Sequence, residues 1–134
     1  MQNGLNKLRF KKTKKGKITK FKFKSTLKFG TIGLKTSKSG ILNLKQFESL
    51  KKTIIRITKN KLKIWLNVFT FLPIYLNPIG VRMGKGKGKF SHFVSRVAAG
   101  TIIVEITGSN KKLLIKSLIA CKLKLPIKTY ICFK

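Results

Sequence analysis

The chain has 134 residues, enough for one domain, and 43% of them are hydrophobic, so it can bury a core and is not a wholly disordered polypeptide. Its 32 lysines and arginines face only two acids, Glu48 and Glu105, so the formal charge of +30 cannot be neutralised by pairing within the chain. Such a charge disfavours the compact state unless a polyanion supplies counter-charge. Because the basic residues run along the whole chain, the sequence predicts a domain embedded in nucleic acid.

Residues 1–28 form a basic arm in which lysines alternate with aromatic and aliphatic residues. Part of it, ITKFKFK, has a period of two, so one face could pack while the other contacts phosphate. A basic tail that is disordered without RNA is the alternative. The segment FGTIGLKT, residues 29–36, then has strand-forming residues interrupted by Gly30 and Gly33, and the SKSG that follows predicts a turn.

The clearest helix begins after Asn43, which can cap it, and Gln46 is placed to complete a capping box. Apolar residues follow at steps of three and four and give the helix one apolar face: Leu44, Phe47, Leu50, Ile54 and Ile57. The next segment, KIWLNVF at residues 63–69, alternates as a strand does, with Ile64, Leu66 and Val68 on one face. Trp65, on the other face, either covers the second side of a sheet or stacks on a base.

A loop containing Pro73 and Pro78 is expected next, and it leads into a glycine–lysine segment. Beyond that segment, HFVSRV and TIIVEIT predict two strands joined by a tight turn at Ala99–Gly100. A second helix begins near Ser109 or Asn110 and ends before Pro126, and TYICF, residues 129–133, predicts a last strand. The residues expected to face the core are Ile102, Val104 and Ile106 in the strand and Leu114, Leu118 and Cys121 in the helix.

These elements predict an α+β fold in which a mainly antiparallel sheet packs with two helices. The expected organisation is a basic arm at residues 1–28 followed by a single domain at residues 29–134, which carries a long glycine–lysine loop. No internal repeat and no linker divides the chain.

The glycine–lysine loop reads GVRMGKGKGK at residues 80–89. A nucleotide-binding P-loop needs Gly-Lys-Ser/Thr after four spacers, and none of the three Gly-Lys pairs here precedes Ser or Thr. A dinucleotide fingerprint would open a helix, which this segment does not. Glycines that let backbone amides approach phosphates, with lysines as counter-charge and Arg82 as a bidentate or stacking group, suit a loop lying against RNA.

Several function classes are disfavoured. Two carboxylates and one histidine, His92, leave almost nothing for acid–base catalysis, so an enzyme and a small-molecule substrate are not expected. Cys121 and Cys132 form no CxxC pair, so neither a metal site nor a cofactor is expected. The most apolar stretch, residues 68–76, is half the length that crosses a bilayer, so no membrane is expected as a partner. A free nucleic-acid chaperone or DNA-compacting protein, and then a cationic membrane-active protein, are the competing classes.

The motif VRMGKGKG resembles the signature of the L-sixteen family of large-subunit ribosomal proteins. FGTIGLKT, the helix after Asn43, KIWLNVF and KLPIKT (residues 124–129) resemble other stretches of that family, in order, from about Leu8 to the end of the chain. The chain departs from the family pattern where Ser91, His92 and Phe93 stand for Glu-Tyr-Trp, and where Ala99 stands for the proline before Gly100.

The resemblance implies a structural role without catalysis. The partners it implies are large-subunit rRNA near the central protuberance and the peptidyl transferase region, aminoacyl-site tRNA, and neighbouring ribosomal proteins. The loop residues it places nearest tRNA and catalytic rRNA are Arg82, Met83, Gly84, Lys85, Gly86, Lys87, Gly88 and Lys89. Contacts to rRNA phosphates are expected from the arm and from scattered basic residues: Arg9, Lys11, Lys12, Lys14, Lys15, Lys17, Lys35, Arg56, Arg96 and Lys128.

The basic residues are strongly biased toward lysine. Only four of the 32 are arginine, and the chain is also rich in Ile, Phe, Asn and Leu, whose codons can all be AT-rich. The surviving arginines are therefore candidates for sites that need a planar, bidentate group. Since the length matches bacterial members of the family, no added presequence is expected, and the bias predicts a protein made inside a mitochondrion. A plastid or the cytoplasm of an AT-rich bacterium is the alternative.

Overall fold

The structure is a computed structural model that describes residue 18, residues 25–84 and residues 86–134. Six residues predicted to contact phosphate (Arg9, Lys11, Lys12, Lys14, Lys15 and Lys17) and the loop residue Lys85 lie outside the described residues. The elements of the described part are, in chain order, β1 (Ile32–Thr36), β2 (Gly40–Asn43), α1 (Leu44–Thr58), β3 (Leu62–Leu66), β4 (Leu72–Leu76), β5 (Lys89–Val97), β6 (Ile102–Gly108), α2 (Lys111–Lys122) and β7 (Thr129–Phe133). None of these helices is long and apolar enough to cross a membrane.

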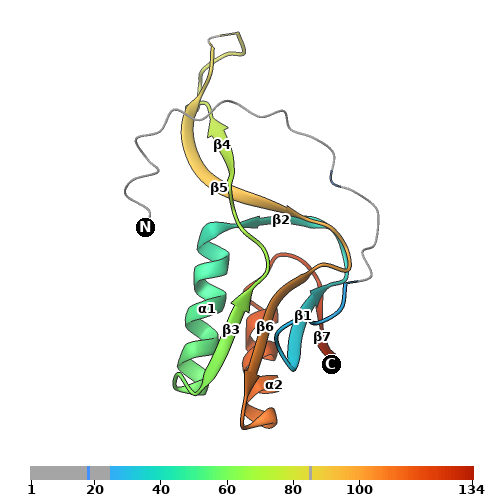
Figure 1. The fold of residues 1–134 in the computed structure, drawn as a ribbon. Coiled ribbons are helices and arrows are strands. Elements are labelled where there is room, and N and C mark those ends of the chain that lie inside the picture. The colour runs from blue at the N-terminus through green and yellow to red at the C-terminus, as the bar shows by residue number, and fades with distance from the viewer. Residues whose placement is uncertain (1–17, 19–24, 85) are drawn as a thin grey trace.

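A four-stranded antiparallel sheet in the order β3-β6-β1-β7 forms the body together with the two helices (Figure 1). One core of buried side chains joins these elements, and it includes Leu34 of β1, Leu50 and Ile54 of α1, Val104 of β6 and Leu118 of α2. Removing such side chains from water is the main force that holds the sheet and helices together.

A second antiparallel sheet, in the order β2-β5-β4, carries the chain away from the body. The inner half of β5 pairs with β2, from Gly40 opposite Val97 to Asn43 opposite Val94. Its outer half pairs with β4 as far as Leu76 opposite Lys89. Figure 1 shows the resulting β4–β5 hairpin rising beyond the helices, with the glycine–lysine loop at its tip.

Both predicted helices and the last strand are confirmed. In α1 the backbone amide of Asn43 donates to the Gln46 side chain at 2.8 Å, as a capping box requires. In α2 the Asn110 side chain accepts from the amide of Leu113 at 3.3 Å, and the helix ends before Pro126. The predicted inward rows of β6 and α2 are buried.

Two predictions about strands are wrong. The expected loop around Pro73 contains β4, and a further strand, β2, begins at Gly40 within the expected SKSG turn. Proline has no amide hydrogen to donate, and Pro73 is accommodated because β4 is an edge strand of its sheet.

The turn at Ala99–Gly100 is present, with Gly100 at a φ of 83°, but it does not make a hairpin. The strands on its two sides, β5 and β6, belong to different sheets. The amide of Gly100 donates to the carbonyl of Thr36 at 2.8 Å, which fixes this corner against β1. The predicted antiparallel strands therefore form two sheets.

Candidate nucleic-acid interface

The tip of the β4–β5 hairpin is open to solvent. Arg82, Met83 and Lys87 are all exposed, and Met83 has 98% of its surface accessible. The tip also exposes apolar side chains, including Ile79 and Val81, which the sequence analysis did not single out. Exposed apolar groups beside cations suit a surface that contacts both bases and phosphates.

The glycines of the loop have two different roles. Gly80, Gly84 and Gly86 have φ values of 86°, 95° and 85°, and a Cβ built on any of them would meet nothing within 4 Å. Glycine is therefore favoured at these positions by the left-handed backbone conformation, and not because a side chain would clash with a neighbouring atom. Gly88 is the reverse case, because a Cβ there would lie 2.6 Å from the carbonyl oxygen of Leu76. The sequence pattern alone does not separate these roles.

Aromatic rings line the hairpin below its tip. The Nζ atom of Lys87 lies 4.0 Å from the ring centroid of Tyr75, close enough for a cation–π interaction. Tyr75 meets Phe90 edge-on with centroids 6.2 Å apart, and Phe90 lies 4.9 Å from Phe93. These contacts stiffen the stem that presents the loop.

The other predicted phosphate contacts are spread over the body. Arg56 of α1, Arg96 of β5 and Lys128, just before β7, are exposed, and so is Lys89 at the start of β5. Lys35 is half-buried, and its Nζ atom donates to the backbone carbonyl of Ser25 at 2.8 Å. The structure therefore does not gather these residues into one patch around the loop.

A basic cleft of about 340 Å³ lies along α1. It is lined by Arg56 together with three lysines that were not among the predicted phosphate contacts: Lys45, Lys52 and Lys124. Three of these residues lie on α1 at spacings of seven and four positions: Lys45, Lys52 and Arg56. These spacings are close to two turns and one turn of a helix, so the sequence could have predicted that the three side chains share one face. Glu48 also lines this cleft.

Glu105 is fully buried in β6 and is held by four donors. Its Oε2 atom accepts hydrogen bonds from the backbone amides of Lys28, Phe29 and Gly30 at 3.0, 2.8 and 2.8 Å. Its Oε1 atom accepts one from the side chain of Asn67 at 2.6 Å. Burial alone would raise the pKa of this carboxyl, but the four donors outweigh burial and hold the pKa below its ordinary value. The buried group is therefore a charged carboxylate that fixes residues 28–30 on the sheet.

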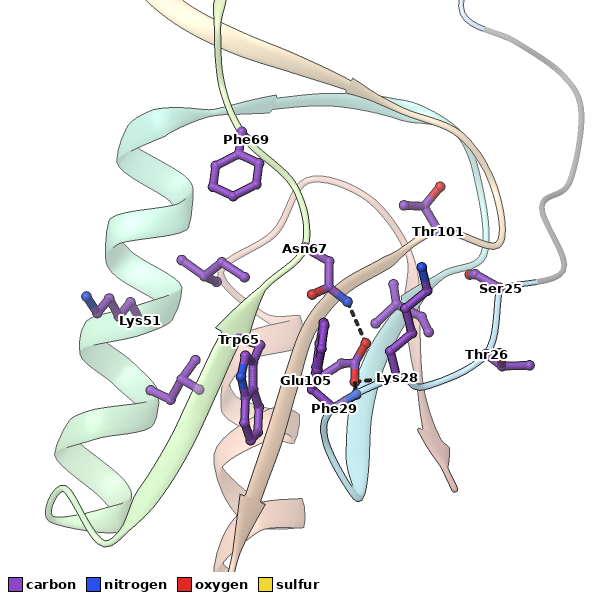
Figure 2. Close-up of a pocket in the computed structure, with 13 residues that line it drawn as sticks. Ser25, Thr26, Lys28, Phe29, Lys51, Trp65, Asn67, Phe69, Thr101 and Glu105 are labelled. Atoms are coloured by element: carbon purple, nitrogen blue, oxygen red, sulfur yellow. Dashed lines mark hydrogen bonds between the residues drawn. The ribbon is translucent and has the colours of Figure 1, made fainter.

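A hollow of about 700 Å³ lies beside this carboxylate, between the segment before β1, the strand β3 and the helix α1 (Figure 2). The rings of Phe29 and Trp65 stack there with centroids 6.1 Å apart, and Phe69 lines the hollow as well. Sequence reasoning identified Trp65 but missed both phenylalanines. Phe29 stands directly before Gly30 and belongs to no periodic pattern. Phe69 ends the alternating segment at residues 63–69 on the same face as Trp65, so the alternation could have indicated it.

Cys121 is buried, Cys132 is half-buried, and both are free thiols. Within the described residues no group of three or more His, Cys, Asp or Glu side chains could hold a metal ion. His92 is half-buried, and its Nδ1 atom lies 2.9 Å from the Ser91 hydroxyl.

Comparison with known proteins gives one consistent family. The family model described as ribosomal protein L16p/L10e matches residues 5–132. The large ribosomal subunit protein uL16 of Orientia tsutsugamushi strain Boryong is 36% identical over 126 residues, which cover 93% of each chain. That of Rickettsia canadensis is 39% identical over the same share, and that of a Buchnera aphidicola strain is 41% identical over 90% of this chain and 89% of its own. With a match over nearly its whole length, the chain belongs to the ribosomal protein L16p/L10e family and is a structural protein of the ribosome, not an enzyme.

Proposed function

We propose that this protein is a constituent of the large ribosomal subunit, where it binds large-subunit rRNA and supports the accommodation of aminoacyl-tRNA. Three observations support the proposal: the large-subunit relatives, the formal charge of +30, and a folded body that carries a long exposed hairpin. A protein with this charge is stable as a compact domain when rRNA supplies the counter-charge.

The hairpin is the single observation that carries the tRNA part of the proposal. Its stem is paired to Leu76 and Lys89, its loop has left-handed glycines, and its side chains Arg82 and Met83 are exposed. We assign this tip to the peptidyl transferase region and to aminoacyl-site tRNA. The residues in contact would be Arg82, Met83, Gly84, Lys85, Gly86, Lys87, Gly88 and Lys89.

The body and the arm have the other role, which is anchoring. In this proposal residues 1–28 act as an rRNA-binding arm and residues 29–134 as the folded domain, and the arm's Arg9 and lysines follow rRNA phosphates. Arg56 of α1, Arg96 of β5 and Lys128, just before β7, are exposed and add phosphate contacts from separate elements. Lys35 contributes less directly, since it already binds the carbonyl of Ser25.

Sedimentation of a cell extract tests the large-subunit assignment. The protein is expected to migrate with large subunits at physiological salt and to leave them only at high salt, because counterion release makes phosphate contacts salt-dependent. Recovery mainly in a free or DNA-bound pool would support the rival nucleic-acid chaperone and would contradict the proposal.

We further propose that the particle is a mitochondrial ribosome. The support is the composition, in which only four of the 32 basic residues are arginine. The relatives compared above are bacterial, so a bacterial ribosome is the competing location, and a plastid ribosome is a third. Locating the gene decides between them: a mitochondrial genome supports the proposal, and a bacterial or plastid genome contradicts it. A reading frame in a nuclear chromosome, preceded by a cleaved leader, would contradict synthesis inside the organelle.

A further inference from the structure

We propose that the hollow formed by Phe29, Trp65 and Phe69 binds one unpaired base of the RNA by stacking. This inference rests on the proposed function, since it takes RNA as the partner, but it concerns a site on the body that lies apart from the hairpin loop. In Figure 2 the dashed lines run from Asn67 and from the segment at Lys28 and Phe29 to Glu105, which lines one side of this hollow.

The first observation is the exposure of the aromatic rings. Phe29 is 61% exposed and Phe69 is 73% exposed, although each could bury a large apolar area. Trp65 is half-buried, and its ring lies at 23° to that of Phe29. Nearly parallel rings at the wall of an open hollow extend a flat surface on which a planar base can continue the stack.

The second observation is the size and chemistry of the hollow. Its volume of about 700 Å³ falls within the ~300–1,000 Å³ typical of small-molecule binding sites. Two lysines are among the residues that line it, Lys51 of α1 and Lys28 of the segment before β1. An aromatic surface with cations at its rim matches a nucleotide, whose base is apolar on its faces and whose phosphate is anionic.

The third observation concerns the only acid among the residues that line the hollow, Glu105. Each of its oxygens already accepts hydrogen bonds, from three backbone amides and from Asn67. The carboxylate is also fully buried, so it does not face an incoming phosphate. One of its bonds comes from the amide of Phe29 itself, at 2.8 Å, which makes Glu105 a positioning residue for the stacking ring.

Trp65 is the only tryptophan of the chain, so its fluorescence reports on this hollow alone. The full-length protein would be titrated with short single-stranded oligoadenylate and, as a charge control, with an oligonucleotide of equal length that has no bases. We expect the oligoadenylate to quench Trp65 emission and the abasic strand to leave it unchanged. Both strands are expected to bind, because both carry phosphates.

Matched variants separate stacking from general binding. Phe69→Leu and Phe29→Leu are expected to weaken oligoadenylate binding about ten-fold, the typical effect of losing one stacked base. Phe71→Leu is the control, since Phe71 is 71% exposed but does not line the hollow, and its affinity is expected to stay within about two-fold of the original. Circular dichroism would confirm that each variant is folded.

The outcomes distinguish this inference from the proposed function. Salt-dependent binding of both strands without base-dependent quenching, and equal affinities of Phe69→Leu and Phe71→Leu, would overturn stacking and leave RNA binding intact. Binding of neither strand would overturn both. In assembled subunits, a benzophenone side chain introduced at position 69 is expected to crosslink to RNA. A crosslink to a neighbouring protein or to residues 1–24 of the same chain would overturn the inference.

Discussion

The Nδ2 atom of Asn67 lies 2.6 Å from the Oε1 atom of Glu105, and this contact joins the end of β3 to the middle of β6. The other carboxylate oxygen binds the three consecutive amides of residues 28–30. One of only two acids in a chain of formal charge +30 is thus used inside the fold, where it fixes the start of the folded domain. This one side chain therefore holds residues 28–30 against β6.

Replacing Glu105 with glutamine is expected to lower the free energy of unfolding by about 3 kcal/mol. The variant loses charge-assisted hydrogen bonds and directs an amide group toward buried donors, each of which is costly to leave unsatisfied. Urea unfolding followed by circular dichroism measures the loss. Glu48→Gln is the matched control, because Glu48 is exposed on α1, and a change within about 0.5 kcal/mol is expected there. Equal effects of the two substitutions would contradict the role given to Glu105.

The stability of the protein should depend on acid pH through the same carboxylate. The pKa of Glu105 in the folded state lies below its ordinary value, so its contribution is complete above about pH 4.3 and is lost as the pH falls through the folded pKa. Protonating both acids adds only two to the formal charge of +30, so changes in general charge repulsion are small. The stability difference between the original protein and Glu105→Gln is therefore expected to shrink below about pH 4. A difference that stays constant would mean that the carboxylate is not charged in the fold.

Gly88→Ala is expected to disrupt the end of the hairpin stem. A Cβ at this position would lie 2.6 Å from the carbonyl oxygen and 2.7 Å from the carbonyl carbon of Leu76, so the backbone must move. Amide hydrogen exchange measures this: exchange is expected to be faster near Lys89 and unchanged in the body. Gly84→Ala serves as the comparison: its φ of 95° makes it strained by about 1–2 kcal/mol, but nothing lies within 4 Å, so the pairing of β4 with β5 is expected to survive. If both variants kept the stem intact, the close approach at Gly88 would be irrelevant.

Alanine at Lys85, Lys87 and Lys89 is expected to leave the fold intact and to flatten the salt dependence of rRNA binding. The slope of log K against log salt should fall by about 0.7–0.9 for each phosphate contact that is lost. A triple alanine variant at Lys111, Lys112 and Lys116 removes the same charge from exposed positions of α2 and controls for net charge. An unchanged slope in the loop variant, or an equal change in both, would show that the loop does not bind phosphate in particular.

The two thiols are expected to react at different rates with iodoacetamide. Burial raises the pKa of Cys121 to about 11, and its side chain is inaccessible, so almost no thiolate is available to react near neutral pH. Cys132 is half-buried, and burial also raises its pKa, so slow labelling is expected at this position first. Mass spectrometry of the labelled peptides measures the order. Faster labelling of Cys121 would mean that α2 opens from the core.

Local signals were sufficient for some elements. Asn43 with Gln46, Asn110 and Pro126 mark helix ends by hydrogen bonds or steric limits within a few residues, and the helices lie where these residues predict. The strand at residues 129–133 was bounded correctly by its composition.

Other elements depend on partners far away in the chain. β2 and β4 are recognisable only through β5, which pairs with both, so neither the short GILN nor the proline-containing LPIYL was evident locally. The turn at Gly100 has local chemistry, but nothing local states that its two strands enter different sheets. Similarly, the alternation of Ile102 and Val104 predicts that Glu105 lies on the opposite face of its strand, away from the core. Only the fold shows that residues 28–30 cover Glu105 on that face.

The same strand, β5, gives the hairpin its mechanical character. Val94 lies opposite Leu72 of β4 and also opposite Asn43, the residue that caps α1. The β4–β5 hairpin and the start of α1 are therefore both attached to one continuous strand, β5, at the same residue. A force on the tip of the hairpin is therefore transmitted along β5 to α1 and to the core, because no flexible hinge separates them.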